Sequence, residues 1–153
     1  MKRVIYLLCF LAFCYGCKSQ QPISVANDKL CKIEYSKYGG MLGFKETLTL
    51  TQDSILYTSL IGRTHKREEG FEKTPAAIWE KLDSSADILQ LDSLKSGESR
   101  LPHDGKDTKY IISLCSGKKY LLINVEDSNA FKKMNSFFTT IIEIKNNIKK
   151  TEK

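Results

Sequence analysis

The sequence predicts an α+β domain, in which an antiparallel sheet of about five strands carries packed helices in the order β-β-β-α-β-β-α. Several short segments alternate apolar and polar residues, which is the period of a half-buried strand, and turn residues separate them. Two other segments place apolar residues three or four positions apart, which is the period of a helix with one buried face. Hairpin strands together with amphipathic helices indicate a helix layer on one sheet.

Three strands are expected in the first half of the domain. Cys31, Ile33 and Tyr35 alternate with polar residues, which predicts the first strand. Residues 47–51 (TLTLT) alternate strictly, and residues 55–61 form a third apolar run. Short turns separate the three segments, so we expect a meander.

A charged loop and a helix are expected next. Residues 62–73 (GRTHKREEGFEK) carry many charges between two turn signals and predict a loop. Thr74 and Pro75 predict a helix start, with a hydroxyl N-cap followed by proline in the first turn. Ser84-Ser85 either interrupts this helix or caps a second short one. The apolar residues at helical spacing are Ile78, Trp79 and Leu82, and the same spacing extends to Ala86 and Leu89.

The last part of the chain predicts a hairpin and a long helix. Residues 96–107 read as a loop, and residues 110–115 and 120–125 as two strands that are apolar on both faces, which favours a central position in the sheet. Residues 127–129 predict an N-cap for the final helix. Its apolar stripe consists of Phe131, Met134, Phe138, Ile141, Ile142 and Ile148.

The first twenty residues predict export. Lys2 and Arg3 precede an apolar run over residues 4–15, which is too short to span a membrane and is typical of a signal peptide. The following Gly16-Cys17 junction resembles the lipobox of bacterial lipoproteins. This resemblance implies a signal peptide over residues 1–16, a lipidated tether over 17–28 and a single α+β domain over 29–153.

The lipobox resemblance also implies a location. Cys17 would carry acyl chains such as palmitate and attach the protein to a membrane of the cell envelope. Lys18 after the cysteine is similar to the signal for the outer membrane, at its periplasmic face or the cell surface. The alternatives are an ordinary secretory signal and an uncleaved anchor.

Two cysteines remain in the domain. Cys31 and Cys115 form an even pair in an oxidising compartment, which makes a disulfide between them possible. Alternation places Cys31 with Ile33 and Cys115 with Ile111, so both side chains are expected to face inward. The alternative is two separate buried thiols.

The charge of the chain excludes a nucleic-acid footprint. Residues 1–16 hold two basic and no acidic residues, so their removal lowers the formal net charge from +6 to +4. The short basic clusters, residues 65–67 and 149–150, have acidic neighbours and read as solvated faces. We therefore expect no nucleic acid as a partner, while the lipobox resemblance implies the membrane.

The sequence offers little chemistry. It holds only two histidines, His65 and His103, and none of the common metal, nucleophile or phosphate-binding motifs, so we expect no catalytic residue, no metal and no cofactor. The rival hypothesis is a small envelope hydrolase that uses His103 and Asp104. Four further acids match surface residues better than a catalytic pair: Asp83, Asp87, Asp92 and Glu98. Trp79, Tyr110 and Tyr120 line either the core or a ligand pocket.

The strongest binding motif is the segment Gly39-Gly40-Met41-Leu42-Gly43. Three glycines in five residues favour a tight turn, in which Met41 and Leu42 have little room to be buried. We expect these five residues to form a partner-contact loop. The alternative is an ordinary glycine turn, or side chains that belong to the core.

Over the whole mature chain, these features resemble a diffuse group of small Bacteroidota lipoproteins. The shared elements are Gly39-Gly40-x-x-Gly43, the helix with Pro75 and Trp79, the Asp104-Gly105 loop and the terminal helix. The glycine element alone, about ten residues, also resembles the start of emfourin-type inhibitors of thermolysin-like metallopeptidases. These resemblances imply a non-enzymatic binding domain, in the form of a peptidase inhibitor or an immunity protein that contacts an envelope protein.

Overall fold

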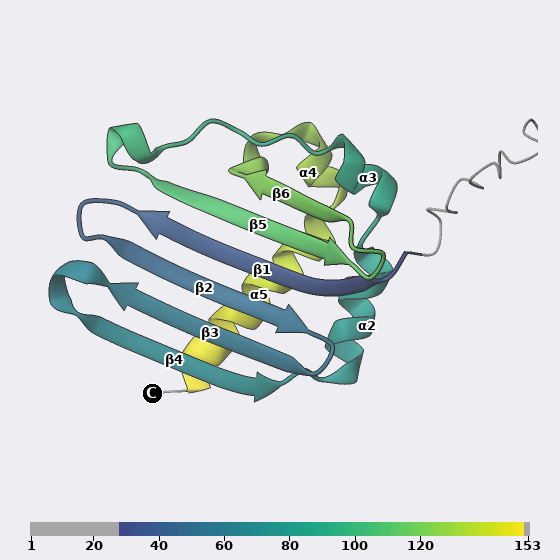
Figure 1. Cartoon of the computed structure of the whole chain (residues 1–153), viewed down its shortest axis with the longest axis horizontal. Coiled ribbons are helices and arrows are strands. Elements are labelled where there is room, and N and C mark those ends of the chain that lie inside the picture. The colour runs from purple at the N-terminus through teal and green to yellow at the C-terminus, as the bar shows by residue number, and fades with distance from the viewer. Residues whose placement is uncertain (1–27, 152–153) are drawn as a thin grey trace, which may run out of the picture.

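Six antiparallel strands form one sheet in the order β4-β3-β2-β1-β5-β6 (Figure 1). The computed structural model describes residues 28–151, without the side chains of residues 127 and 149–151. The predicted α+β class is confirmed, with six strands rather than about five. The strands are β1 (Leu30–Gly39), β2 (Phe44–Thr51), β3 (Ser54–Ile61), β4 (Lys66–Lys73), β5 (Lys106–Leu114) and β6 (Lys119–Ile123). The signal peptide, Cys17 and the tether up to residue 27 lie outside the described residues.

Four α-helices in the described part of the chain lie on one face of this sheet, and the opposite face is left open (Figure 1). The long helix α5 crosses behind β1, β2 and β3, while the shorter helices lie toward one end of the sheet. The helices are α2 (Ala76–Ser85), α3 (Ile88–Ser93), α4 (Asn129–Lys133) and α5 (Asn135–Thr151).

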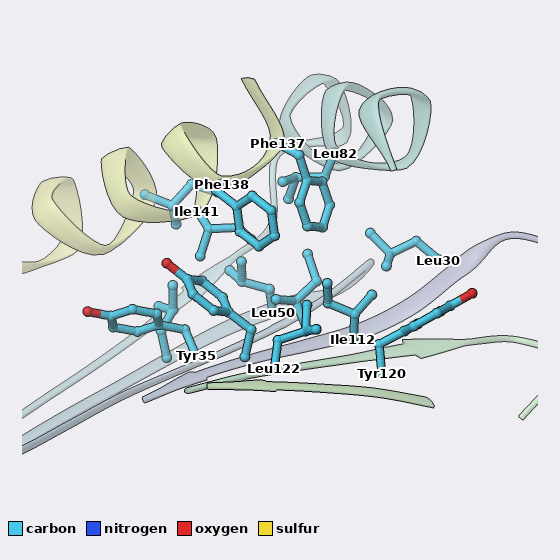
Figure 2. Packing of buried hydrophobic residues seen from close by; sticks show 14 of the residues in the cluster. Leu30, Tyr35, Leu50, Leu82, Ile112, Tyr120, Leu122, Phe137, Phe138 and Ile141 are labelled. Atoms are coloured by element: carbon cyan, nitrogen blue, oxygen red, sulfur yellow. The ribbon is translucent and has the colours of Figure 1, made fainter. Parts of the chain in front are cut away.

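The core lies between the sheet and α5. Phe137, Phe138 and Ile141 of α5 point at the apolar side chains of the strands (Figure 2). The ring centroids of Phe138 and Tyr110 are 4.9 Å apart, with the edge of one ring toward the face of the other. Because every second strand residue points to this layer, alternation in the sequence predicts which side chains are buried.

The predicted loop over residues 62–73 is wrong for most of its length. After the 3₁₀ helix η2 (Gly62–Thr64), residues 66–73 pair with β3 as the edge strand β4, from Ile61 opposite Lys66 to Ser54 opposite Lys73. An edge strand has one free side and one solvated face, so it tolerates the charges that indicated a loop.

The predicted central hairpin is also partly wrong. β5 lies between β1 and β6, but β6 is the other edge of the sheet. Its exposed Leu121 explains the apolar character that suggested burial on both faces.

The helix boundaries differ from the prediction in two places. Thr74 is not an N-cap: its hydroxyl donates to the carbonyl of Thr51 at 2.8 Å, and α2 begins after Pro75 without a side-chain cap. The predicted terminal helix is divided at Met134, and Ser128 caps only the first piece, α4, by accepting a hydrogen bond from the amide of Phe131. Met134 is buried at the break.

Candidate functional site

Three loops meet at one end of the sheet, and we call this surface the loop end. It consists of residues 40–43 between β1 and β2, residues 62–65 between β3 and β4, and residues 101–105 before β5 (Figure 1). Backbone hydrogen bonds join them. The amide of Gly40 donates to the carbonyl of Gly105 at 3.0 Å, and the amide of Arg63 donates to the carbonyl of Leu42 at 3.2 Å. The central turn is therefore held on both sides by its neighbours.

Glycine is required in the central turn for two reasons. Gly39, Gly40 and Gly43 have φ angles of 111°, 76° and 63°, in the region that L side chains rarely adopt. At Gly39, an added Cβ would also lie only 2.5 Å from the Cδ2 atom of Leu101. The turn geometry and the close approach of the third loop depend on these residues.

The loop end exposes three apolar side chains. Met41 is 68% exposed, Leu42 is 52% exposed and Leu101 is 42% exposed. The structure therefore excludes the core alternative for Met41 and Leu42. Held by the backbone bonds of the turn, these side chains form a small apolar surface on a supported loop.

A buried carboxylate supports the third loop. Asp107, at the start of β5, accepts hydrogen bonds from the amide of Arg100 and the hydroxyl of Ser99, both at 2.7 Å, and from the amide group of Asn124 at 2.8 Å. Burial raises the pKa of Asp107, but these three donors outweigh it and the pKa is lowered below its ordinary value. Asp107 is therefore charged at neutral pH and holds the loop against the sheet.

Basic residues border the loop end. Arg63, Arg100 and Lys106 are exposed, and the ammonium of Lys106 lies 4.4 Å from the ring centre of Phe44. Beside the loop end, the open face of the sheet contains a shallow hollow of about 240 Å³. Its lining residues are Lys45, Thr47, Thr58, Ser59, Leu60 and Arg67. Exposed apolar and basic groups therefore lie together at this end of the sheet.

His103 and Asp104, the residues of the hydrolase hypothesis, also lie at the loop end. Both are exposed, at the end of the 3₁₀ helix η3 (Leu101–His103). Asp104 has a φ of 54°, and its amide donates to the carbonyl of Leu101 at 3.2 Å. The turn accounts for the position of both residues.

Three of the other candidate carboxylates have structural partners. Asp83 accepts from the amide of Leu30 at 2.8 Å, Asp87 caps α3, and Asp92 pairs with the ammonium of Lys118 at 2.6 Å. These contacts account for the positions of the three acids.

The aromatic residues considered for a ligand pocket belong to the core. Trp79, Tyr110 and Tyr120 are all buried in the main apolar cluster. Trp79 also borders a groove of about 440 Å³ beside Pro75, but neither tyrosine lines it.

The opposite end of the sheet, which we call the Asp28 end, is where the described chain begins. A disulfide joins Cys31 to Cys115 there, with α-carbons 5.0 Å apart. The amide of Cys115 donates to the carbonyl of Lys29 at 2.9 Å, and Ser116 is hydrogen-bonded to Asp28. These bonds fix the start of β1 to the end of β5.

The predicted inward orientation of the two cysteines is wrong. Both residues are exposed, and Ile111 lies on the open face, not the core face. A register shift between Leu30 and Lys32 breaks the alternation of β1, so Leu30 is buried and Cys31 is not.

The described part of the chain, residues 28–151, shows neither a metal-binding cluster nor a membrane-spanning helix. No group of three or more His, Cys, Asp or Glu side chains in this part of the chain is placed to hold a metal ion. None of its helices has the length and apolar character needed to cross a membrane.

Comparison with known proteins returned no matching family model and no matching curated protein.

Sequence reasoning found one of the three loops of this site. Residues 62–65 and Leu101 lie far from the glycine turn in the chain, and no local pattern brings them together. The Asp107 support was missed as well, since an aspartate at the start of a strand reads as a surface charge. The remaining signal was the Asp104-Gly105 turn, which marks a tight loop without indicating its neighbours.

Proposed function

We propose that this protein is a membrane-tethered lipoprotein of the cell envelope whose domain binds another protein at the loop end, without catalysing a reaction. The observation that carries the proposal is the exposure of Met41 and Leu42 on a turn bonded to two further loops. A supported turn loses little conformational entropy on binding, and compact apolar anchors of this kind supply most of the affinity in many interfaces.

The charge around these anchors supports a partner with an acidic surface. Arg63, Arg100 and Lys106 are exposed beside the apolar side chains, against the single acidic residue Asp104 in the three loops. Complementary charge raises the association rate and selects among partners more than it raises affinity. We expect the association rate to fall as salt rises.

The proposed lipid attachment leaves this surface accessible. β1 has ten residues, and at roughly 3.3 Å per residue it separates the Asp28 end from the loop end by about 33 Å. An anchor at Cys17 would act at the Asp28 end. Replacement of Cys17 by serine should move the protein from the membrane fraction to the soluble fraction, and inhibition of lipoprotein signal peptidase should leave a larger precursor. Unchanged fractionation and size would refute the anchor.

The binding proposal is tested with a photo-reactive amino acid at position 41 of the full chain, in the cells that encode it. The matched control carries it at Leu89, which is 75% exposed on α3, away from the loop end. We expect one discrete adduct from position 41, identified by mass spectrometry, and none of the same protein from position 89. Equal labelling from both positions would count against the loop end.

Affinity for the identified partner gives the quantitative test. Met41→Ala with Leu42→Ala should weaken binding by about 10- to 100-fold, because each truncation removes an anchor. Leu89→Ala should leave binding unchanged. The thermal midpoint should stay nearly constant in all variants, since the side chains are exposed.

A metallopeptidase is one class of partner that fits a supported, protruding loop. The full chain is titrated into a thermolysin-type peptidase, with the Met41→Ala, Leu42→Ala variant as control. Stoichiometric inhibition by the unmodified chain alone would identify the inhibitor form of the proposal. No inhibition at any ratio would exclude that form for this peptidase class.

A further inference from the structure

The edge strand β4 has features of an interface. It pairs with β3 on one side only, so alternate backbone N–H and C=O groups on its other side are available to another strand (Figure 1). Phe71, which lies opposite Leu56, is 73% exposed in the middle of this edge strand. A large exposed aromatic side chain is unusual on an edge, where charges ordinarily prevent association.

We propose that two copies of this chain associate through antiparallel pairing of β4 with β4. A twofold axis perpendicular to the sheet relates the two copies. Their sheets then form one continuous sheet, and the helices of both copies lie on the same face of it. In this arrangement Phe71 of one copy lies opposite Phe71 of the other on the open face. Glu69 of each copy, which also pairs with Arg67 of its own strand, then lies opposite Lys73 of the other copy, which makes two cross-strand pairs of opposite charge.

The charges of β4 select this register among those that keep the helices on one side. In a pairing centred on Glu69, the Glu69 carboxylates of the two chains lie opposite each other, and a pairing centred on Glu72 does the same for Glu72. A pairing centred on Gly70 places Glu68 of one chain opposite Glu72 of the other. A pairing centred on Glu68 places the Glu68 carboxylates of the two copies against each other. Like charges directly opposite each other destabilise a strand pair. The Phe71-centred register avoids all of these contacts and overlaps residues 69–73.

The association is compatible with a lipid anchor on both copies. The antiparallel arrangement places the two Asp28 ends at opposite sides of the joined sheet. Residues 18–28 span at most about 38 Å when fully extended, which allows both copies to reach one membrane with the sheet lying along it. Both loop ends stay uncovered, so the dimer and the proposed binding function are independent.

Charge exchange tests the register. The full chain is purified in mild detergent, and its association constant is measured by sedimentation equilibrium. Glu69→Lys alone or Lys73→Glu alone creates two like-charge pairs and should weaken the dimer by about tenfold or more. The double variant restores opposite charges and should recover the association constant of the unmodified chain.

A matched control uses the central strand β1. Lys32 and Glu34 form an ion pair of 2.6 Å on the same open face, with side chains exposed to a similar degree. Lys32→Glu and Glu34→Lys change the net charge of the chain as the edge variants do, and should leave association unchanged.

Cross-linking provides a second readout. Phe71→Cys should form an intermolecular disulfide under mild oxidation, and Leu121→Cys, on the opposite edge and the same face, should not. Any of three results would overturn the proposal. The chain could be monomeric at all concentrations, its association could be insensitive to the charge of residues 69 and 73, or cross-linking could be equal at both edges.

Discussion

Replacement of Cys31 and Cys115 by serine removes a cross-link between residues 84 positions apart in the sequence. The cross-link restricts the unfolded chain far more than the folded one, because the start of β1 is also held by the hydrogen bond between Cys115 and Lys29. In the chain-entropy description, closing a loop of this length contributes about 4.5 kcal/mol to the free energy of unfolding. That is a large share of the roughly 5–15 kcal/mol by which a domain is usually stable.

The measurement is equilibrium unfolding of the full chain in urea, followed by tryptophan fluorescence at Trp79. With a urea dependence of roughly 1.5–2 kcal/mol per molar for a domain of this size, we expect the midpoint to fall by about 2–3 M. The unmodified protein unfolded under reducing conditions should match the double-serine variant, because both lose the same constraint.

Two results would refute this reasoning. A loss below about 1 kcal/mol would show that the unfolded chain is already restricted without the bridge. Two free thiols, titrated in unfolded protein that has not been reduced, would show that the bridge does not form.

Three further predictions concern buried polar groups and the glycine turn. The lowered pKa of Asp107 stabilises the folded state above about pH 4, the pKa of an unfolded aspartate, and this stability is lost as the pH falls through the lower folded pKa. Asp107→Asn should therefore flatten the acid dependence and cost about 1–3 kcal/mol at neutral pH, measured by urea unfolding between pH 2 and 7. Lys145→Met should destabilise by about 3 kcal/mol because it leaves the buried Glu46, 3.1 Å from the ammonium, without its cation, and Glu46→Gln on that background should recover part of the loss in a double-mutant cycle. Gly39→Ala should lower the thermal midpoint by several degrees more than Gly117→Ala, since both glycines have positive φ but only Gly39 has atoms where a Cβ would stand; equal effects would show that backbone strain alone matters.

The parts of the fold that were predictable are those with a local cause. Alternation at residues 47–51 identified β2, and the helical spacing of Trp79 and Leu82 identified α2, because a repeating pattern reports directly on one buried face. The glycine turn was predictable for the same reason, since positive φ angles favour glycine.

The errors have a cause outside their own segment. Residues 66–73 form a strand because β3 presents a free edge to them, and nothing in the segment itself indicates that neighbour. Cys31 is exposed because a register shift interrupts β1, and that shift depends on how β1 pairs with β5. The terminal helix is divided at the buried Met134, although its apolar spacing continues through that position and gives no local sign of the break.

The candidate site likewise has one part that the sequence determined and another that depends on the tertiary structure. The sequence by itself determined that Met41 and Leu42 lie on a glycine turn, because three glycines in five residues leave no space for a buried pair. Only the tertiary structure decided that this turn is bonded to residues 62–65 and 101–105, that Asp107 supports the third loop, and that the Asp28 end lies across the sheet from all of them. The physical reason is that a turn is encoded by the torsion preferences of adjacent residues, whereas the meeting of three loops depends on the strand order of the whole sheet.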